Sequence, residues 1–463
     1  MIDTMYVVCV GGGYVGSVTG VSFAALGNKT TVIDISREKV DLINGGKSPI
    51  YEPGLEYIIQ QTIGKSLFAT TEYHCIAEAG VIFIGVETPT APDGSADLKC
   101  VKNAATSIGE NINKNKFTLI VNKSTVPTGT GEVVSSIISE VSGLIPEKDF
   151  SVVSNPEFLR EGSALQDVFF PDRIVVGANN QIAKEIMREL YKPLVTRENY
   201  HKLCERYFNF EWETPEKLPI YFETDVRTAE LIKYASNGFL AVKISFINEV
   251  AKLCEKLGTN VLDVAKGMGL DSRIGDKFLE VSSGWQGSCF PKDTSELYLL
   301  SKNYECELSI VKAAIDANFA MHRYVVEKII RFLGCLNGKT IGILGLTFKP
   351  NTDDARKTQA EFIIPHLLSL GASIKAFDPQ GMETFKKFNP TLDIKYCEKA
   401  EDVAQRADCV LLLTHWQEFM NLNWQEMVNT LKTPYVLDTR NFLNREKLQE
   451  LGFCYQGLGV KSK

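Results

Sequence analysis

The chain lacks several features that would assign it to whole classes of protein. Its 463 residues carry a net charge of −7, so no excess of positive charge favours binding to nucleic acid or to an anionic membrane. No uninterrupted apolar stretch approaches the ~20 residues that are needed to span a bilayer. The first residues, MIDTMYVVCVGGG, place no basic region before the apolar run, so we expect no signal peptide.

Patterns typical of metal sites and disulfide frameworks are also missing. The five histidines form no H-E-x-x-H pair, and the 11 cysteines are odd in number, scattered and never spaced C-x-x-C. Such a pattern favours neither a zinc site nor a set of disulfides. We therefore expect no bound metal and a reducing, cytoplasmic location in which most thiols are simply packed.

What the sequence does contain is apolar runs that alternate with helical stretches. The runs MYVVCV, KTTVIDIS, GVIFIGVETPT, FTLIVNKSTVP, FSVVSNPEF and DRIVVGA predict the buried strands of a parallel sheet. A second α/β pattern begins beyond Gly338, where KTIGILGL, ASIKAFDP, ADCVLLLTHW and TPYVLDTRN predict strands and residues 360–370 predict a helix. We predict an α/β fold with two Rossmann-like, doubly wound domains.

One long helix is predicted between these two patterns, from Asp225 to Leu257. Apolar residues recur there near a period of 3.6, and the stripe that they predict is Leu231, Ala235, Val242, Phe246, Val250, Leu253 and Leu257. The predicted domains are residues 1–222, a central helical domain of residues 223–330, and residues 331–463. The stretch 195–222 has no clear period and is interpreted as a surface lobe or a linker.

A glycine-rich turn follows the first predicted strand. Gly11, Gly13 and Gly16 are spaced G-x-G-x-x-G, and Asp34 ends the next strand 18 residues after Gly16. Such glycines let the backbone approach a pyrophosphate at a helix N-terminus, while the acid binds the ribose hydroxyls and repels a 2′-phosphate. The pattern predicts a dinucleotide site for NAD rather than NADP. Lys39 lies either near the ribose or on the solvated surface.

The stretch SGWQGSCFPKDTSEL places Cys289 just before a predicted helix. Pro291 fits the first turn of that helix, and a helix N-terminus favours the thiolate form of a cysteine. Gly287 would let a bulky substrate approach. Cys289 is therefore either a catalytic nucleophile or a buried, inert thiol, and the flanking residues favour the nucleophile.

Two further pairs of polar residues have a spacing of four. Lys233 and Asn237 lie on one face of the long helix, where a cation and an amide can hold an oxyanion or can simply be exposed. Glu157 and Glu161 follow a predicted strand, and they either order water near the nicotinamide ribose or form a solvated acidic surface.

Together these motifs resemble the UDP-glucose/GDP-mannose dehydrogenase family, and within it the UDP-glucose 6-dehydrogenases. The resemblance rests on GGGYVG, NKSTVP, SNPEFLREGSALQDVFFPDRIVVG, ELIKYASNGFLAVKISFINE, DSRIGDKFL, GSCFPKD, GLTFKPNTDDAR and LDTRN. It implies a C-terminal domain that binds the UDP-sugar and a long helix that forms a dimer contact. It also implies oxidation of the 6-hydroxymethyl group of UDP-glucose to a carboxylate by two NAD molecules, through a cysteine thiohemiacetal and thioester.

The resemblance also implies roles for individual residues. Cys289 would be the nucleophile, Lys233 and Asn237 would stabilise oxyanions, and Asp293, helped by Glu157 and Thr125, would support acid–base steps and activate water. Arg273 would reach the substrate of the partner subunit in a homodimer or a larger homo-oligomer. The implied cofactor residues are Gly11, Gly13, Tyr14, Val15, Gly16, Asp34, Lys39, Thr88, Thr125, Glu161 and Arg356. The implied UDP-sugar residues are Glu157, Phe158, Leu159, Lys233, Asn237, Arg273, Phe278, Gly287, Phe348, Lys349 and Arg440.

The sequence departs from the family pattern at a few positions. The family has two glycines before Ser-Cys, whereas here Gln286 precedes Gly287, and a side chain at that position would crowd the sugar or change which sugar is accepted. Glu87 stands where an asparagine is common, and Lys357 where an acid is usual.

Three alternative functions remain open at this point. The first is a nucleotide-sugar dehydrogenase that acts on GDP-mannose, although SRIG followed by KFL favours the UDP-glucose type. The second is a hydroxyacid dehydrogenase, which would use one NAD per substrate and would need neither Cys289 nor a second α/β domain. The third is an inactive NAD-bound assembly protein, which the presence of Cys289, Lys233, Asn237 and Asp293 together disfavours.

Overall fold

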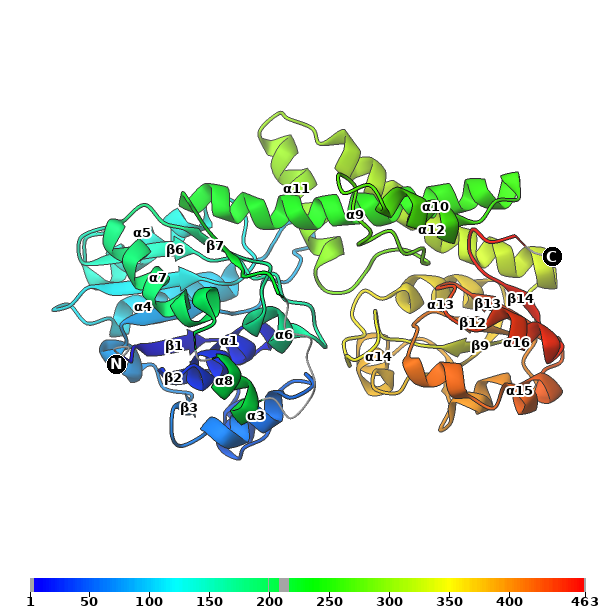
Figure 1. Cartoon of the computed structure of the whole chain (residues 1–463), viewed down its shortest axis with the longest axis horizontal. Helices are drawn as coiled ribbons and strands as arrows, with labels where there is room; N and C mark the ends of the chain where they lie inside the picture. The colour runs from blue at the N-terminus through cyan, green and yellow to red at the C-terminus, as the bar shows by residue number, and fades with distance from the viewer. Residues whose placement is uncertain (1–3, 199, 208–215, 462–463) are drawn as a thin grey trace. The chain divides into compact units, whose positions relative to one another are not determined.

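The computed structural model describes residues 4–198, 200–207 and 216–461, and the chain forms two compact units, residues 1–235 and 236–463 (Figure 1). Each unit contains one sheet with helices packed against it. This arrangement confirms the predicted α/β fold with two Rossmann-like domains and a long central helix. Within the described residues, no helix combines the length and the apolar character needed to cross a membrane.

The sheet of the first unit has eight strands in the order β3-β2-β1-β4-β5-β6-β7-β8. The first six, β3-β2-β1-β4-β5-β6, follow the strand order of a dinucleotide-binding fold, in which the order reverses between β1 and β4. Ligands bind at such a reversal, beyond the carboxyl ends of the strands. The strands are β1 (Tyr6–Val10), β2 (Lys29–Ile33), β3 (Leu67–Thr70), β4 (Val81–Ile84), β5 (Thr118–Asn122), β6 (Phe150–Ser154), β7 (Arg173–Gly177) and β8 (Ile220–Thr224).

The sequence led us to expect a sheet that is parallel throughout, but this sheet contains one antiparallel pair. β7 is antiparallel to β6 and touches it through a single pair, Ser154 with Gly177, whereas β7 and β8 pair in parallel over five residues. β1, β4, β5 and β6 are almost wholly buried, as near-continuous apolar strands covered on both faces must be.

The helices of this unit cover the sheet from both sides. Buried residues of α1 pack with those of β1 and β2 in one core, and α4 and α5 cover a second core. The helices are α1 (Tyr14–Ala25), α2 (Arg37–Asn44), α3 (Leu55–Thr62), α4 (Lys99–Asn111), α5 (Thr130–Ser142), α6 (Ala164–Phe169), α7 (Gln181–Thr196) and α8 (Tyr200–Tyr207), with a 3₁₀ helix η1 (His74–Glu78).

The stretch 195–222, which we had interpreted as a surface lobe or a linker, contains a helix and a strand within its described residues. α8 packs through Tyr200 and Tyr207, and Tyr200 donates a hydrogen bond of 2.5 Å to the carbonyl of Phe169. β8 adds an edge strand to the sheet. Residues 208–215 of this stretch lie outside the described residues.

The long helix α9 (Val226–Leu257) begins one residue after the predicted start and ends at the predicted residue. The apolar stripe that we predicted does not identify its buried side. Phe246, Leu253 and Leu257 are more than half exposed, whereas Ala241, Ile247, Ala251 and Cys254 are buried. The period of the apolar residues therefore predicted the helix but not which of its sides is buried, because apolar residues lie on both sides.

The sheet of the second unit has six strands in the order β11-β10-β9-β12-β13-β14, all parallel. This is the same pattern as in the first unit, and the order reverses between β9 and β12. The strands are β9 (Thr340–Leu344), β10 (Ser373–Phe377), β11 (Ile394–Tyr396), β12 (Cys409–Leu412), β13 (Tyr435–Asp438) and β14 (Cys454–Gln456).

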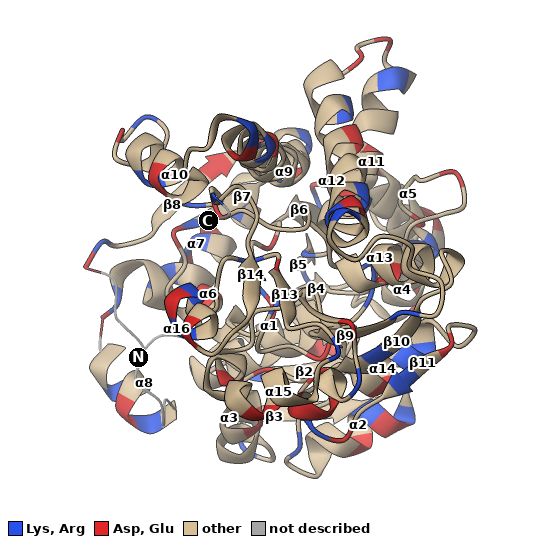
Figure 2. Ribbon diagram, turned by 90° about the vertical axis from the view of Figure 1, so that its right-hand side faces the viewer, with Lys and Arg blue, Asp and Glu red and all other residues tan. Residues whose placement is uncertain are grey.

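Helices of the second unit carry acidic and basic residues side by side, as on α14 and α16 (Figure 2). Positive charge does gather elsewhere in this unit, because Lys375 of β10, Lys395 of β11, Arg406 and Lys432 line one pocket. Besides part of α9, the helices are α10 (Val261–Gly269), α11 (Phe290–Asn303), α12 (Ser309–Leu333), α13 (Gln359–Ser369), α14 (Met382–Phe388), α15 (Trp424–Thr430) and α16 (Arg445–Glu450), with 3₁₀ helices η2 (Ala400–Ala404) and η3 (Gln417–Asn421).

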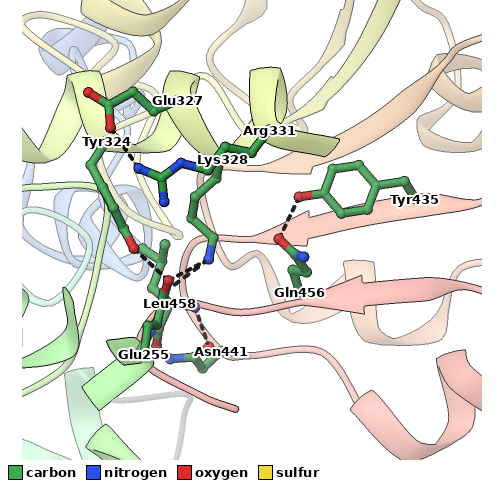
Figure 3. Close-up of polar contacts among 10 residues, drawn as sticks. Glu255, Tyr324, Glu327, Lys328, Arg331, Tyr435, Asn441, Gln456 and Leu458 are labelled. Carbon is green, nitrogen blue, oxygen red and sulfur yellow. Dashed lines mark hydrogen bonds and ion pairs between the residues drawn. The ribbon is translucent and has the colours of Figure 1, made fainter. Parts of the chain in front are cut away.

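The C-terminal segment is held against two long helices of the second unit by Glu255, a residue of α9 (Figure 3). Glu255 accepts hydrogen bonds from Lys328 and Tyr324 of α12, at 2.9 and 2.5 Å, and from the backbone amide of Gly459, at 2.9 Å. Asn441 donates a further bond of 2.8 Å to the carbonyl of Leu458. A half-buried carboxylate with three donors thus holds the segment around Gly459 against the two helices.

Candidate functional site

The glycine-rich turn joins β1 to α1 at the point where the strand order of the first sheet reverses. Gly11 has φ of +111°, a conformation that only glycine adopts readily, and a Cβ at Gly16 would lie 1.8 Å from the Gly11 carbonyl oxygen. The close approach of these two glycines lets α1 start directly over the end of β1. A Cβ at Gly13 would meet no atom within 4 Å, so the backbone is open on that side.

Asp34 follows the end of β2 and faces this turn. Its carboxylate accepts hydrogen bonds from the backbone amides of Gly12, at 2.6 Å, and Ser36, at 2.8 Å. Lys39 lies 3.6 Å from the same carboxylate and 38% of its side chain is exposed, so it is a surface lysine that also pairs with Asp34. The open turn, the first amides of α1 and a neighbouring carboxylate are together the groups that hold a pyrophosphate and a ribose.

Tyr14 and Val15 begin α1 and are half-buried. The hydroxyl of Tyr14 hydrogen-bonds to Glu52 and accepts from the amide of Gly162, at 2.7 Å. Tyr14 therefore ties the glycine-rich turn to the loop that contains Glu161. Glu161 itself is half-buried in that loop, which has no helical geometry, so its spacing of four from Glu157 does not place the two carboxylates on one helix face.

A buried ion pair lies at the carboxyl end of β6. Oε1 of Glu157 is 2.9 Å from Nζ of Lys233 on α9, and the two side chains are 6% and 5% exposed. Oε2 of Glu157 accepts from the amide of Leu159 at 2.5 Å, and the hydroxyl of Thr125 lies 3.4 Å from Oε1. Glu157 is therefore not part of a solvated acidic surface, nor is Lys233 an exposed lysine.

A second lysine, which the sequence analysis did not single out, lies near this pair. Lys123 follows β5, is 9% exposed, and donates hydrogen bonds to Asn155 Oδ1 at 3.0 Å and to the Tyr191 hydroxyl at 3.3 Å. Its hydrogen-bond partners are neutral, and the largest charge effect that favours its charged form comes from the more distant Glu157. In the sequence, Lys123 and Asn155 lie inside the predicted strand runs FTLIVNKSTVP and FSVVSNPEF, but no role was assigned to either residue.

These surroundings shift the pKa of both charged groups. Burial alone would raise the pKa of Glu157, but the charge and hydrogen bond of Lys233 and the amide of Leu159 hold that pKa below its usual value. Burial lowers the pKa of Lys123 to about 8, although the charge of Glu157 opposes this shift. Glu157 is consequently a carboxylate at neutral pH, and it is flanked by Lys233 and Lys123.

Cys289 lies in the second unit at the N-cap of α11, with Pro291 in the first turn of the helix as predicted. The cysteine is exposed, and its sulfur is 3.8 Å from the hydroxyl of Ser288. The alternative of a buried, inert thiol does not describe it. Cys306, Cys335 and Cys454 are exposed as well, so exposure does not distinguish Cys289, and fewer thiols are packed than we expected.

Asp293 lies one turn into α11 and is completely buried. Its Oδ2 accepts a hydrogen bond of 2.6 Å from Asn237 of α9, and its Oδ1 accepts one of 2.6 Å from Lys292. Its backbone amide donates to the carbonyl of Cys289 at 2.8 Å. The structure thus brings Asn237, Asp293 and the backbone of Cys289 together, and it adds Lys292, which the sequence analysis did not select.

The loop before Cys289 is held by the segment that follows β9. The side-chain nitrogen Nε2 of Gln286 donates to the backbone carbonyl of Phe348 at 2.8 Å. The backbone amide of Gly287 donates to the carbonyl of Lys357 at 3.1 Å. Gly287 has φ of +86°, and a Cβ there would lie 2.9 Å from the ring of Phe348. Gly287 is therefore required by the packing of Phe348 as well as by its backbone conformation.

Arg440 follows β13 in the second sheet. Its Nε donates to the carbonyl of Leu413 at 2.8 Å, and its Nη2 is buried without a hydrogen-bond partner among the described residues. Burial lowers the pKa of Arg440 to about 10, with the charge of Asp438 opposing. A guanidinium group with a remaining buried donor beside the strand-order reversal is suited to an anionic ligand.

The remaining predicted residues are spread over both units. Phe158 packs under Arg173 and Lys233, whose cationic groups lie 3.9 and 5.3 Å from its ring, and Thr88 donates to the carbonyl of Thr125 at 2.9 Å. In the second unit, Arg356 pairs with Asp354 at 2.7 Å, Lys349 lies 5.4 Å from the Phe348 ring, Phe278 lies 6.3 Å from Phe290, and the exposed Arg273 pairs with Asp271 at 2.6 Å.

The chain matches one protein family along most of its length. Residues 5–195 match the NAD binding domain of the UDP-glucose/GDP-mannose dehydrogenase family, residues 227–320 its central domain, and residues 342–445 its UDP binding domain. The glycine-rich turn and Asp34 lie in the first of these parts, Asn237, Cys289 and Asp293 in the second, and Arg440 in the third.

Individual relatives agree with this match. A UDP-glucose 6-dehydrogenase of Rhizobium meliloti (strain 1021) is 40% identical over 461 residues, which are 98% of this chain and 99% of the relative. One from Rickettsia conorii (strain ATCC VR-613 / Malish 7) is 41% identical over 99% of this chain and 100% of its own. The structure of a UDP-glucose dehydrogenase from Pyrobaculum islandicum is 36% identical and covers 99% of this chain and 98% of that one, with a TM-score of 0.87.

The fold and the sites together define an NAD-dependent oxidoreductase of the nucleotide-sugar dehydrogenase class. More particularly, the chain belongs to the UDP-glucose/GDP-mannose dehydrogenase family, and its cofactor is NAD.

Proposed function

We propose that this chain oxidises the 6-hydroxymethyl group of UDP-glucose to the carboxylate of UDP-glucuronate, using two NAD per sugar. The observation that carries the proposal is the position of Cys289, which has an exposed thiol and lies at the N-terminus of α11. Its backbone carbonyl accepts a hydrogen bond from the backbone amide of the buried Asp293. Relatives named UDP-glucose 6-dehydrogenase, at about 40% identity over nearly the whole chain, support UDP-glucose as the substrate.

The second oxidation needs a nucleophile, because the hydrogen on an aldehyde carbon can leave as a hydride only after a nucleophile has added to that carbon. Loss of one hydride and one proton converts the alcohol to the aldehyde. The sulfur of Cys289 then adds to the aldehyde carbon, which gives a thiohemiacetal, and loss of a second hydride gives a thioester. Water cleaves the carbon–sulfur bond, which releases the carboxylate and restores the thiol. Bound NAD supplies the acceptor for each of the two hydrides.

The surrounding residues divide the remaining work. Asn237 and Lys233 are donors for the oxyanions of the thiohemiacetal and of thioester hydrolysis. Glu157, kept ionised by Lys233, serves with Thr125 to orient the water. Asp293 orients Asn237 and Lys292 and takes part in the proton transfers at the carbon that reacts.

Roles for the binding residues follow the same proposal. Gly11, Gly13 and Gly16 with the first turn of α1 would hold the pyrophosphate of NAD, and Asp34 would hold its adenosine ribose. Arg440 is proposed to bind the diphosphate of the UDP-sugar through the donor that remains on its buried Nη2. We propose a cytoplasmic enzyme, because all 11 cysteines are free thiols, which is typical of a reducing compartment.

We also propose that the chain functions as a homodimer formed through α9. Phe239, Phe246 and Leu253 are 65%, 51% and 54% exposed, and they are spaced seven residues apart, so they lie on one face of the helix. Three large apolar side chains in one exposed row are typical of an interface. Arg273, which pairs with Asp271 in its own chain, would then reach the substrate of the partner subunit.

Counting NADH per sugar tests the proposal most directly. With limiting UDP-glucose and excess NAD, we expect two NADH per sugar and a product that carries a carboxylate. One NADH per substrate molecule would support a one-step dehydrogenase. NADH formation with GDP-mannose but not with UDP-glucose would favour the other named branch of the family, and no NADH from any nucleotide sugar would support an inactive NAD-binding protein.

A further inference from the structure

The loop before Cys289 contains a buried amide that is only half used. Gln286 is 8% exposed, and its Nε2 donates to the backbone carbonyl of Phe348 at 2.8 Å. The oxygen of the same amide, Oε1, is buried and has no hydrogen-bond partner among the described residues. The bond to Phe348 fixes which end of the amide is nitrogen, so the unused atom is an acceptor and not a donor.

The backbone around Gln286 holds this acceptor in one place. The next residue, Gly287, donates its amide to the carbonyl of Lys357, and the ring of Phe348 occupies the space where a Cβ of Gly287 would lie. Gln286 is therefore fixed at its backbone and at its amide nitrogen. A buried acceptor that is fixed but unpaired costs stability, so a donor is expected to reach it in the working protein.

The position of Gln286 in the chain limits what that donor is. Three peptide units separate its Cα from that of Cys289, so the two Cα atoms are at most about 11 Å apart. If Cys289 bonds to the oxidised carbon of the substrate, Gln286 is separated from that carbon by no more than the length of one sugar ring and its linkage. The donors available there on a nucleotide sugar are the hydroxyls of the hexose.

We propose that Gln286 determines which hexose is accepted, because its Oε1 accepts a hydrogen bond from one hydroxyl of the sugar. This inference rests on the proposed function. The side chain does not merely crowd the sugar, which is one of the effects that the sequence led us to expect. It is drawn toward Phe348 and presents a single acceptor. A site that is built to receive a hydroxyl rejects an analogue that lacks it, because the acceptor is then left buried and unpaired.

Gln286→Met is the main test, because methionine has nearly the same length and volume but offers no comparable acceptor. Binding of UDP, UDP-glucose and the 2-, 3- and 4-deoxy forms of UDP-glucose would be measured by titration calorimetry without NAD. For the wild-type protein we expect one deoxy sugar to bind about tenfold more weakly than UDP-glucose. For Gln286→Met we expect that deoxy sugar and UDP-glucose to bind equally, with the affinity for UDP unchanged.

A uniform loss of affinity for UDP and every sugar in Gln286→Met would overturn the proposal, because it would mean that Gln286 only holds the loop. An unchanged dependence on all three hydroxyls would overturn it as well, because a water molecule would then be the donor. If Gln286→Met does not fold, Gln286→Gly removes the side chain without a steric clash, and the same two comparisons decide the outcome.

This experiment also separates the inference from the proposed function, because binding without NAD needs no turnover. A wild-type protein that binds UDP-glucose but produces no NADH would contradict the proposed oxidation, and the deoxy series would still decide the role of Gln286. A wild-type protein that does not bind UDP-glucose at all would overturn both.

Discussion

Nζ of Lys233 lies 2.9 Å from Oε1 of Glu157, and about one-twentieth of each side chain is exposed to solvent. Lys233 belongs to α9 and Glu157 to the loop after β6, so the pair ties the long helix to the carboxyl edge of the first sheet. Two charges removed from water in this way stabilise the fold only while both are present.

Removal of one partner from this pair is expected to be strongly destabilising. Lys233→Ala leaves the Glu157 carboxylate buried with only Lys123, the Leu159 amide and Thr125 nearby. The expected loss in the free energy of unfolding is about 3–5 kcal/mol, measured by urea denaturation at pH 7. The double variant Lys233→Met with Glu157→Gln should recover much of this loss, because no uncompensated charge remains.

The ion pair between Arg37 and Asp41 is the matched control within the same unit. Both side chains are more than half exposed, and they lie 3.1 Å apart on one helix. Arg37→Ala should therefore change the free energy of unfolding by at most about 0.5 kcal/mol. Similar losses in the free energy of unfolding for Lys233→Ala and Arg37→Ala would contradict the view that burial makes the Lys233–Glu157 pair costly to break.

Substitution by alanine should have different effects on stability at two glycines of the same motif. A Cβ at Gly16 would lie 1.8 Å from the Gly11 carbonyl oxygen, whereas one at Gly13 would meet no atom within 4 Å. Gly16→Ala should lower the free energy of unfolding by about 3 kcal/mol, because α1 must move away from β1. Thermal and urea unfolding would measure this loss.

Gly13→Ala should leave the free energy of unfolding within about 0.5 kcal/mol of the wild type. Its φ of −83° is one that alanine adopts without strain. The added methyl group would instead occupy the open side of the turn, so the affinity for NAD should fall, about tenfold for a displaced pyrophosphate contact. Fluorescence titration with NADH measures it. An alanine at Gly13 that binds NADH as tightly as glycine would remove the turn from the cofactor site.

Much of the fold followed from local patterns in the sequence. The strand–glycine turn–helix–strand unit at residues 6–33, the long helix α9 and the start of α11 at Cys289 all depend on residues close together in the chain. The antiparallel contact of β7 with β6 and the exposed side of α9 did not follow. Both depend on which distant segments pack together, and a period in the sequence does not carry that information.

The same distinction explains which parts of the candidate site were missed. Lys123 and Asn155 meet because β5 and β6 are neighbours in the sheet, and Tyr191 reaches both of them from α7. Lys292 is adjacent to Asp293 in sequence, but its ion pair with that carboxylate depends on their side-chain conformations. Lys123, Asn155 and Lys292 stand inside the motifs NKSTVP, SNPEF and GSCFPKD, but their contacts with one another and with Tyr191 and Asp293 could not be derived from those motifs.

The low pKa of Lys123 predicts a pH-dependent contribution to stability. Its pKa is about 8 in the folded protein and about 10.4 in an unfolded chain, so between these values the unfolded state binds more protons. The free energy of unfolding therefore rises with pH through this window, and the cost of burying charged Lys123 is largest below pH 8. From pH 7 to 9.5 the wild type should gain about 2 kcal/mol relative to Lys123→Met.

Urea denaturation of both proteins at the two pH values measures this difference, and titrations elsewhere in the chain cancel in it. Lys192→Met is the matched control, because Lys192 is an exposed lysine of the same unit, with half of its side chain accessible. A gain as large for Lys192 as for Lys123, or no gain for either, would contradict the effect of burial on Lys123.

The exposed row on α9 predicts how the chain assembles. Phe246→Asp places a charge in the middle of the row formed by Phe239, Phe246 and Leu253, and burying that charge in an interface is costly. Sedimentation velocity should therefore show a dimer for the wild type and a monomer for this variant. Phe388→Asp is the control, because Phe388 is also half exposed but lies outside α9. Dissociation by both variants, or by neither, would contradict an interface on α9.

Cys289 offers the most direct test of the chemistry. Serine at this position is a much weaker nucleophile toward the aldehyde carbon, so Cys289→Ser should bind NADH with unchanged affinity and lose at least about a thousandfold in turnover. Cys306→Ser changes another exposed cysteine of the same unit and should leave turnover unaltered. Steady-state NADH formation from UDP-glucose measures both variants. Mass spectrometry of the quenched wild-type reaction should in addition find a sugar adduct on Cys289. Carboxylate product formed at the normal rate by Cys289→Ser would mean that the second oxidation does not need the thiol.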